Sequence, residues 1–128
     1  MLDDAPRHAF DASLEEVIAA LPEDLHALLE EVPLIVEDEP SWSLAAGLRL
    51  DPRRVELLGL HWGVPLTRRS VDHGYRLPDQ MMLFRGPIIR QVERTEGSLA
   101  GQIRITLLHE VGHHFGLDEQ QLRRLGYG

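Results

Sequence analysis

Two histidines and a glutamate near the carboxyl end of the chain have the residue types and the spacing of a metal centre. They stand in the run His109-Glu110-Val111-Gly112-His113. Residues four apart on a helix lie one above the other, so both imidazoles can reach one ion. Glu110 sits about 100° around the helix from His109, where its carboxylate can take a proton from a metal-activated water. The pattern predicts a Zn²⁺ site with Glu110 as the general base.

A catalytic zinc ion needs a third protein ligand and keeps its fourth position for water. Gly116 can adopt the left-handed conformation that ends a helix and turns the chain back toward the ion. Glu119 is then the expected third ligand, and Asp118 is the alternative because one residue of slack in the turn exchanges the two. The chain has no cysteine, so imidazole and carboxylate groups must hold any metal.

The remaining histidines are interpreted differently. His114 follows His113 directly but points about 100° away from it on a straight helix, so we expect it to pack or to support the ligands. The others are scattered, and we expect surface or locally hydrogen-bonded roles for His8, His26, His61 and His73, although the turn at His73 could approach the site. Candidates for an oxyanion partner are Arg68, Arg69, Tyr75 and Tyr127.

The histidines must be carried by a long helix. Ser98 is a plausible cap for its start, and Gly116 supplies its end. Its expected inward positions are Leu99, Ile103, Leu107, Val111 and Phe115. A short last helix is expected over residues 120–125.

The elements upstream follow from periodicity and from breaking residues. We expect an amphipathic helix over residues 11–21 capped by Asp11 or Ser13, and a second helix from Pro22 to about Glu30. One strand is expected over 33–37 and another, near an edge, within 58–66. A single helical turn is expected over 51–57, and a later helix is opened by Pro87. The run Gln80–Phe84 predicts another strand with two open interpretations: an exposed edge that binds an extended substrate, or an ordinary core strand. Trp42 and Trp62 are expected as partly buried anchors.

Length and charge limit the classes of function. A chain of 128 residues predicts a single domain over residues 1–128, with residues 1–9 flexible. A formal net charge of −8 argues against nucleic-acid binding. No apolar run is long enough for a signal peptide or a membrane span, so we expect a cytoplasmic protein with no membrane partner, most simply a monomer.

The chain resembles the minimal zincin-like metallopeptidases, a family of small bacterial single-domain proteins with the motif HExxHxxGxxD. The likeness extends over the segments 36–40, 57–69, 77–87 and 105–125. The resemblance implies an α+β zincin-like fold, with a short mixed sheet packed over a C-terminal active-site helix. It also implies zinc held by His109, His113 and the family's acidic position, where this chain has Glu119 in place of the usual Asp.

Together these features predict a zinc-dependent hydrolase, most simply a metallopeptidase that acts on a peptide or protein substrate. A non-catalytic, zinc-stabilised interaction module is the alternative from another class. Glu110 separates the two, because a structural zinc site needs no carboxylate beside its ligands and is normally closed by four protein groups. A metal hydrolase of non-peptide amides or esters is a further alternative.

Overall fold

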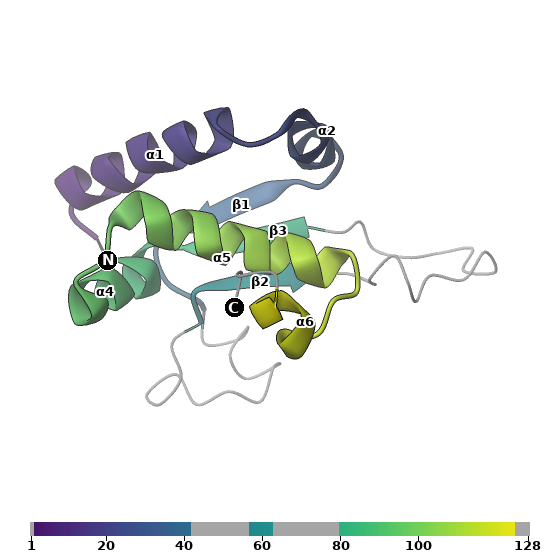
Figure 1. Ribbon diagram of the computed structural model, residues 1–128. Helices are drawn as coiled ribbons and strands as arrows, with labels where there is room; N and C mark the ends of the chain where they lie inside the picture. Colours follow the sequence, from purple (N-terminus) through teal and green to yellow (C-terminus); the bar gives the residue numbers. More distant parts are fainter. Residues whose placement is uncertain (1, 42–56, 63–79, 125–128) are drawn as a thin grey trace.

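The computed structural model describes residues 2–41, 57–62 and 80–124 (Figure 1). The side chains of Trp62, Glu119 and Leu122 lie outside this described part. So do several expected features: the helical turn over 51–57 except for its last residue, and the side chains of Trp42, Arg68, Arg69, His73, Tyr75 and Tyr127.

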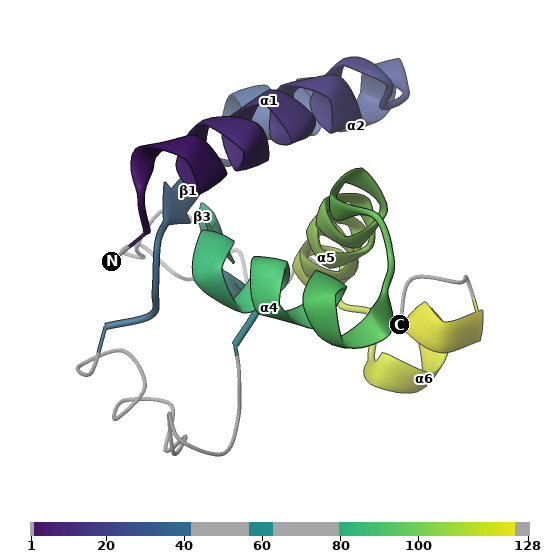
Figure 2. The same cartoon turned by 90° about the vertical axis from the view of Figure 1, so that its left-hand side faces the viewer.

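The described residues form helices around a small sheet. The elements are α1 (Asp4–Ala19), α2 (Glu23–Glu31), β1 (Leu34–Glu37), β2 (Gly59–Trp62), β3 (Gln80–Phe84), α4 (Arg85–Thr95), α5 (Leu99–His114) and α6 (Glu119–Arg124). The sheet has the order β1-β3-β2, with β1 parallel and β2 antiparallel to β3. Helix α5 lies along the sheet and packs against β2, β3, α1 and α4 (Figures 1 and 2). The expected α+β fold, a short mixed sheet over the motif-bearing helix, is confirmed.

Strand β3 is the centre of the described sheet. Val36 of β1 and Gly59 of β2 both align with Leu83 of β3. The interpretation of Gln80–Phe84 as an exposed edge strand is therefore wrong, and the alternative of a core strand is correct. The physical reason is that β1 and β2 pair with its two hydrogen-bonding edges, while its side chains Met81 and Leu83 are fully buried. The strand expected within 58–66 is β2, which lies at one edge of the sheet formed by the described residues.

The main core lies where α1, β3, α4 and α5 meet. Its buried side chains are Phe10, Leu14, Val17, Leu21, Leu83, Ile88, Ile103, Leu107 and Leu108. Helix α1 begins at Asp4 and not near Asp11, so residues 4–9, which we expected to be flexible, form its first turns. Phe10 is fully buried, and burying such a ring stabilises the fold by roughly 1.5–3 kcal/mol. The burial of Phe10 offsets the entropy cost of ordering the helical turns that precede Asp11.

Four half-buried charged residues connect α1 to the end of β1 and the start of α4. This charge cluster consists of Arg7, Asp11, Asp38 and Arg85. Asp38 accepts from Arg7 Nη2 at 2.6 Å and from Arg85 Nη1 at 3.0 Å, and Arg85 Nε donates to Asp11 at 2.9 Å. The hydrogen bond from Arg7 holds the pKa of Asp38 below its usual range, and Arg85 adds to this effect against the opposing effect of burial. Burial lowers the pKa of Arg85, but the bonds and charges of Asp11 and Asp38 outweigh it and raise the pKa.

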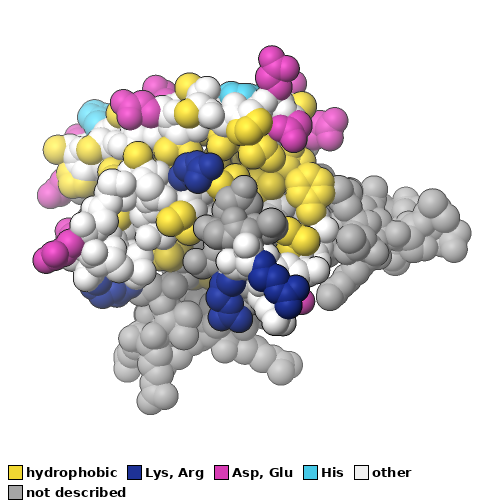
Figure 3. All heavy atoms as spheres, viewed as in Figure 1, with side chains coloured by type: hydrophobic (Ala, Val, Ile, Leu, Met, Phe, Trp, Pro, Cys, Tyr) yellow, Lys and Arg dark blue, Asp and Glu magenta, His cyan; other side chains and the backbone are white. Residues whose placement is uncertain are grey.

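The surface reflects the acidic composition. Figure 3 shows acidic side chains along the border formed by α1 and α2, beside hydrophobic side chains on the same face. In the described ranges, no helix is both long and apolar enough to span a bilayer.

Candidate metal and active site

The end of α5 is shaped by the turn that the sequence predicted at Gly116. Gly116 has a φ of 83°, a conformation that costs a residue with a side chain about 1–2 kcal/mol. Its amide donates to the carbonyl of His113, and the amide of Leu117 donates to that of Gly112, both at 3.0 Å. This pair of bonds is a Schellman motif, which stops the helix and reverses the chain. The residues that follow are thereby brought back beside the last turn of α5.

At the other end, the Ser98 side chain accepts from the amide of Gly101 at 3.0 Å, so the predicted cap of this helix is confirmed. One expected inward position is wrong. Phe115 is the C-cap residue and remains 42% exposed, because the helix ends at His114 and no longer directs the next side chain toward the core.

His109 and His113 lie together on one face of α5. Their ring centroids are 4.7 Å apart and their planes meet at 74°, as the four-residue spacing predicts. Both side chains are half-buried, so part of each imidazole remains accessible to a metal ion from solvent. The arrangement brings two imidazoles to one place, which suits Zn²⁺ because imidazole is one of its preferred ligands.

Glu110 lies beneath strand β2 and is only 6% exposed. A Cβ added at Gly59 would meet the Met82 carbonyl oxygen and Thr106 Cγ2 at 3.0 Å, and Glu110 Cγ at 3.2 Å. The strand can therefore pass this close to α5 because residue 59 has no side chain. This close approach fixes the space in which the Glu110 carboxylate sits.

Glu110 belongs to a row of polar residues on α5 that we call the polar stripe: Gln102, Thr106, Glu110 and His114, each four residues from the next. Thr106 and His114 are 4% and 3% exposed. Gln102 Nε2 donates to Thr106 Oγ1 at 3.1 Å, and His114 Nδ1 lies 3.3 Å from Nε2 of His61 on β2. His114 is buried, as expected for a packing residue, and His61 is one of its partners.

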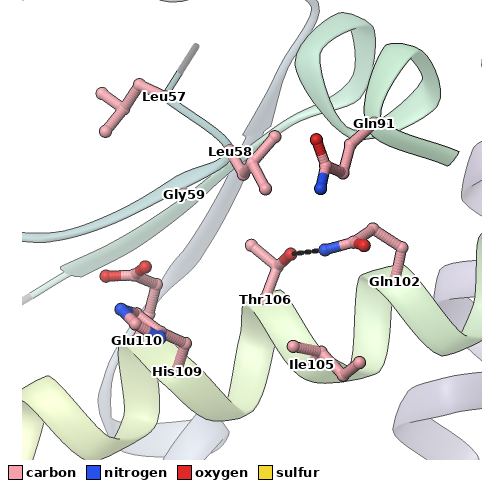
Figure 4. A pocket seen from close by; sticks show the side chains of 9 residues that line it. All are labelled: Leu57, Leu58, Gly59, Gln91, Gln102, Ile105, Thr106, His109 and Glu110. Atoms are coloured by element: carbon pink, nitrogen blue, oxygen red, sulfur yellow. Dashed lines mark hydrogen bonds between the residues drawn. The ribbon is translucent and has the colours of Figure 1, made fainter. Parts of the chain in front are cut away.

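A pocket of about 410 Å³ opens beside His109 and Glu110 (Figure 4). Its lining residues are Leu57, Leu58, Gly59, Gln91, Gln102, Ile105, Thr106, His109 and Glu110. In Figure 4 the histidine and the carboxylate lie at one end, while the amides from α4 and α5 lie at the other. The candidate base and one candidate ligand thus face a cavity large enough for a side chain of a bound molecule.

The acidic residues after Gly116 differ in their surroundings. The amide of Gln121 donates to Asp118 Oδ1, and the amide of Asp118 donates to Gln121 Oε1, both at 2.8 Å. This reciprocal pair is a capping box that starts α6. Glu119 is the first residue of α6, and its side chain lies outside the described part. Among the side chains that are described, no group of three histidines, aspartates or glutamates is placed to hold a metal.

The sequence reasoning missed the residues that enclose the pocket. Gly59 and Gln91 come from separate segments, and their positions depend on pairing between distant parts of the chain. The polar stripe was visible in principle, because its members recur every four residues at positions that a helix would bury together with Glu110. A search for buried polar periodicity would have indicated Gln102 and Thr106.

Comparison with known proteins agrees with this geometry. The chain belongs to the zincin-like metallopeptidase family, whose model matches residues 29–128. The match covers every described strand, the α5 helix with its histidines, and α6. A search of curated proteins found no match.

Proposed function

We propose that this protein is a zinc-dependent peptidase in which His109, His113 and Glu119 hold the metal and Glu110 is the general base. The observation that carries the proposal is the shared location of His109, His113 and Glu110 on α5. Two half-buried imidazoles lie 4.7 Å apart on α5, and the buried carboxylate between them in the sequence lines the same pocket as His109. Membership of the zincin-like metallopeptidase family supports the same conclusion.

The residues present fit a zinc ion. Two imidazoles and a carboxylate are the donor set of many catalytic zinc sites. The capping box supports Glu119 over Asp118 as the third ligand, because an Asp118 carboxylate that moved to a metal would give up its bond to the amide of Gln121. The Schellman turn at Gly116 supports it as well, since it returns the chain toward the histidines.

Zinc, when bound, would acidify a water molecule and polarise the carbonyl group of the substrate. The part of Glu110 is proton transfer: its carboxylate accepts the proton of the attacking water and later gives it to the leaving amine. Burial beneath β2 limits the rotamers of Glu110 and excludes competing water.

We also propose that the chain acts as one domain, because Phe10 of α1 and Ile103 of α5 share one core.

The test combines metal analysis with cleavage of a broad peptide library by the wild type and by Glu110→Gln. We expect one zinc per chain in both proteins, and a loss of cleavage in the variant of roughly 100-fold to 10,000-fold. Glu119→Gln should lose zinc. Asp118→Asn is the matched control, because asparagine keeps a cap for α6 and should retain zinc.

Three outcomes would contradict the proposal. Stoichiometric zinc with no cleavage by the wild type would favour the non-catalytic zinc module. Cleavage of esters or non-peptide amides alone would favour a hydrolase of another class. A wild type that binds no divalent metal would contradict both the proposed peptidase and the non-catalytic zinc module.

A further inference from the structure

The far end of the pocket holds two carboxamide groups, and each bonds to a neighbouring side chain. Gln91 Oε1 accepts from Nη2 of Arg94 at 2.6 Å. A guanidinium group only donates, so the oxygen of this amide must face it and the NH₂ group must face away. Gln102 Nε2 donates to Thr106 Oγ1 at 3.1 Å, which leaves Oε1 of Gln102 as an acceptor.

These two groups offer one donor and one acceptor. Within the described part of the chain, neither the amide nitrogen of Gln91 nor the amide oxygen of Gln102 has a protein partner. Figure 4 shows the Gln91 amide reaching from α4 toward the Gln102 and Thr106 pair on α5. Both residues line the pocket, so a bound molecule would meet a donor and an acceptor there.

The rest of the pocket limits what such a molecule can be. Leu57, Leu58 and Ile105 supply apolar walls, which favour a short aliphatic stem. Among the described residues that line the pocket, only His109 and Glu110 are ionisable, and they lie at the other end. A cationic head group there would lie near the Arg94 guanidinium, which bonds to Gln91, and a carboxylate would face Oε1 of Gln102 with no donor to offer it.

From this complementarity we infer that the pocket receives the side chain of a glutamine or asparagine beside the scissile bond of a peptide. Its carbonyl oxygen would accept from Gln91 Nε2, and its NH₂ group would donate to Gln102 Oε1. This inference rests on the proposed function, since it names the substrate class of the same site. An aliphatic side chain would fill the walls but would leave the donor and the acceptor unsatisfied, which costs affinity.

The test begins with a peptide library whose cut positions are read by mass spectrometry. We expect glutamine or asparagine to be enriched at one position next to the cut. Peptides that differ only there, carrying Gln, Glu, Leu or Lys, then give kcat/KM for the zinc-loaded wild type. Gln should exceed both Leu and Glu by about tenfold, the size of one well-placed hydrogen-bonded pair.

Variants of Gln102 separate the amide chemistry from the shape of the pocket. Gln102→Leu should reduce the ratio of Gln to Leu cleavage severalfold, because the acceptor is gone while the Gln91 donor remains. Gln102→Glu should raise cleavage of the Lys peptide relative to the Gln peptide. Ala12→Glu adds the same charge on the exposed side of α1 and should leave all ratios unchanged. Gln91→Leu gives a second variant if Gln102→Leu does not fold, as judged by circular dichroism.

A binding measurement keeps this test independent of catalysis. Fluorescence anisotropy of the same labelled peptides with zinc-loaded Glu110→Gln should show tighter binding of the Gln peptide by about tenfold. If the wild type cleaves peptides but favours Leu, the pocket inference fails and the proposed function stands. If no peptide is cleaved but the Gln peptide is still preferred in binding, the proposed function fails, and recognition of the amide side chain by the pocket stands without a scissile bond beside it. Equal binding of all the peptides overturns the pocket inference.

Discussion

The charge cluster and the polar stripe both place polar side chains against the core, but they are completed in different ways. In the charge cluster, Arg85 and Asp38 meet opposite charges, and Phe10 lies 5.9 Å below the Arg85 guanidinium. In the polar stripe, Gln102 and Glu110 line a pocket. From this comparison we infer a rule for this molecule. Polar groups that bond to one another hold elements together, and polar groups that face a cavity bind or react with a substrate.

The largest effect that tests this rule is expected for Arg85→Ala. The change leaves Asp11 and Asp38 without a shared donor and removes packing over Phe10, so the free energy of unfolding should fall by roughly 1–3 kcal/mol. Because none of the cluster residues is among the described residues that line the pocket, kcat/KM should stay unchanged when it is measured at a low temperature at which the variant is folded. Chemical denaturation and peptide cleavage, measured on the same preparation, check both halves.

The matched control for this change is Arg104→Ala, since Arg104 is exposed on α5 and lies outside the cluster. Its stability should change by less than about 0.5 kcal/mol. A loss of activity in Arg85→Ala at unchanged stability would break the rule, because a closed cluster would then be acting on the chemistry.

Gly59→Ala should produce the next largest effect, and on the opposite side of the comparison. The added Cβ would lie 3.0 Å from Thr106 Cγ2 and 3.2 Å from Glu110 Cγ, so β2 and α5 must separate by a few tenths of an ångström. A misplacement of 1 Å at a catalytic group costs about 100-fold, so we expect kcat/KM to fall by roughly tenfold. Zinc content should be unchanged. The free energy of unfolding, measured by thermal unfolding, should fall by a comparable amount, about 1–2 kcal/mol.

Gly97→Ala is the control for this substitution. Its added Cβ would meet only Thr95 Oγ1, at an ordinary 3.4 Å, and Gly97 lies at the exposed connection between α4 and α5. If Gly97→Ala loses as much activity as Gly59→Ala, the effect is not one of contact with Glu110.

The two regions also differ in how far the sequence alone could predict them. The cap at Ser98, the turn at Gly116 and the common face of His109 and His113 follow from local rules, because each depends on residues within one or two helical turns. The charge cluster joins positions as far apart as Arg7 and Arg85, and no local pattern indicates which of the many acidic residues meets which arginine.

The same distinction explains the errors at α1 and β3. The helix begins at Asp4 because Phe10 and Arg7 are held by distant partners, not because a capping side chain marks that start. Whether Gln80–Phe84 is a central or an edge strand depends on its parallel pairing with β1, more than forty residues away by the register of Leu34 with Met81. Alternating hydrophobicity shows that a strand is buried, but not which strands flank it.

The smallest expected effect is a pH dependence that belongs to the charge cluster alone. Asp38 faces Arg7 and Arg85, with Asp11 and Asp4 paired to the same arginines. Because the pKa of Asp38 is lowered in the folded protein, its contribution is fully present above the usual aspartate range, near pH 4. It is lost as the pH falls through the folded-state pKa.

Asp38→Asn should therefore lower the free energy of unfolding by about 1 kcal/mol at pH 7. The difference from the wild type should begin to shrink below about pH 4 and approach zero as the pH falls through the lowered pKa of Asp38, where the folded wild-type carboxyl is protonated as well. Urea denaturation from pH 2 to pH 7 measures this difference, and all other acidic groups cancel between the two proteins. Asp3→Asn, an exposed change outside the cluster, should show no such convergence. A difference that stays constant with pH would mean that Asp38 contributes through shape and hydrogen bonding, not through its charge.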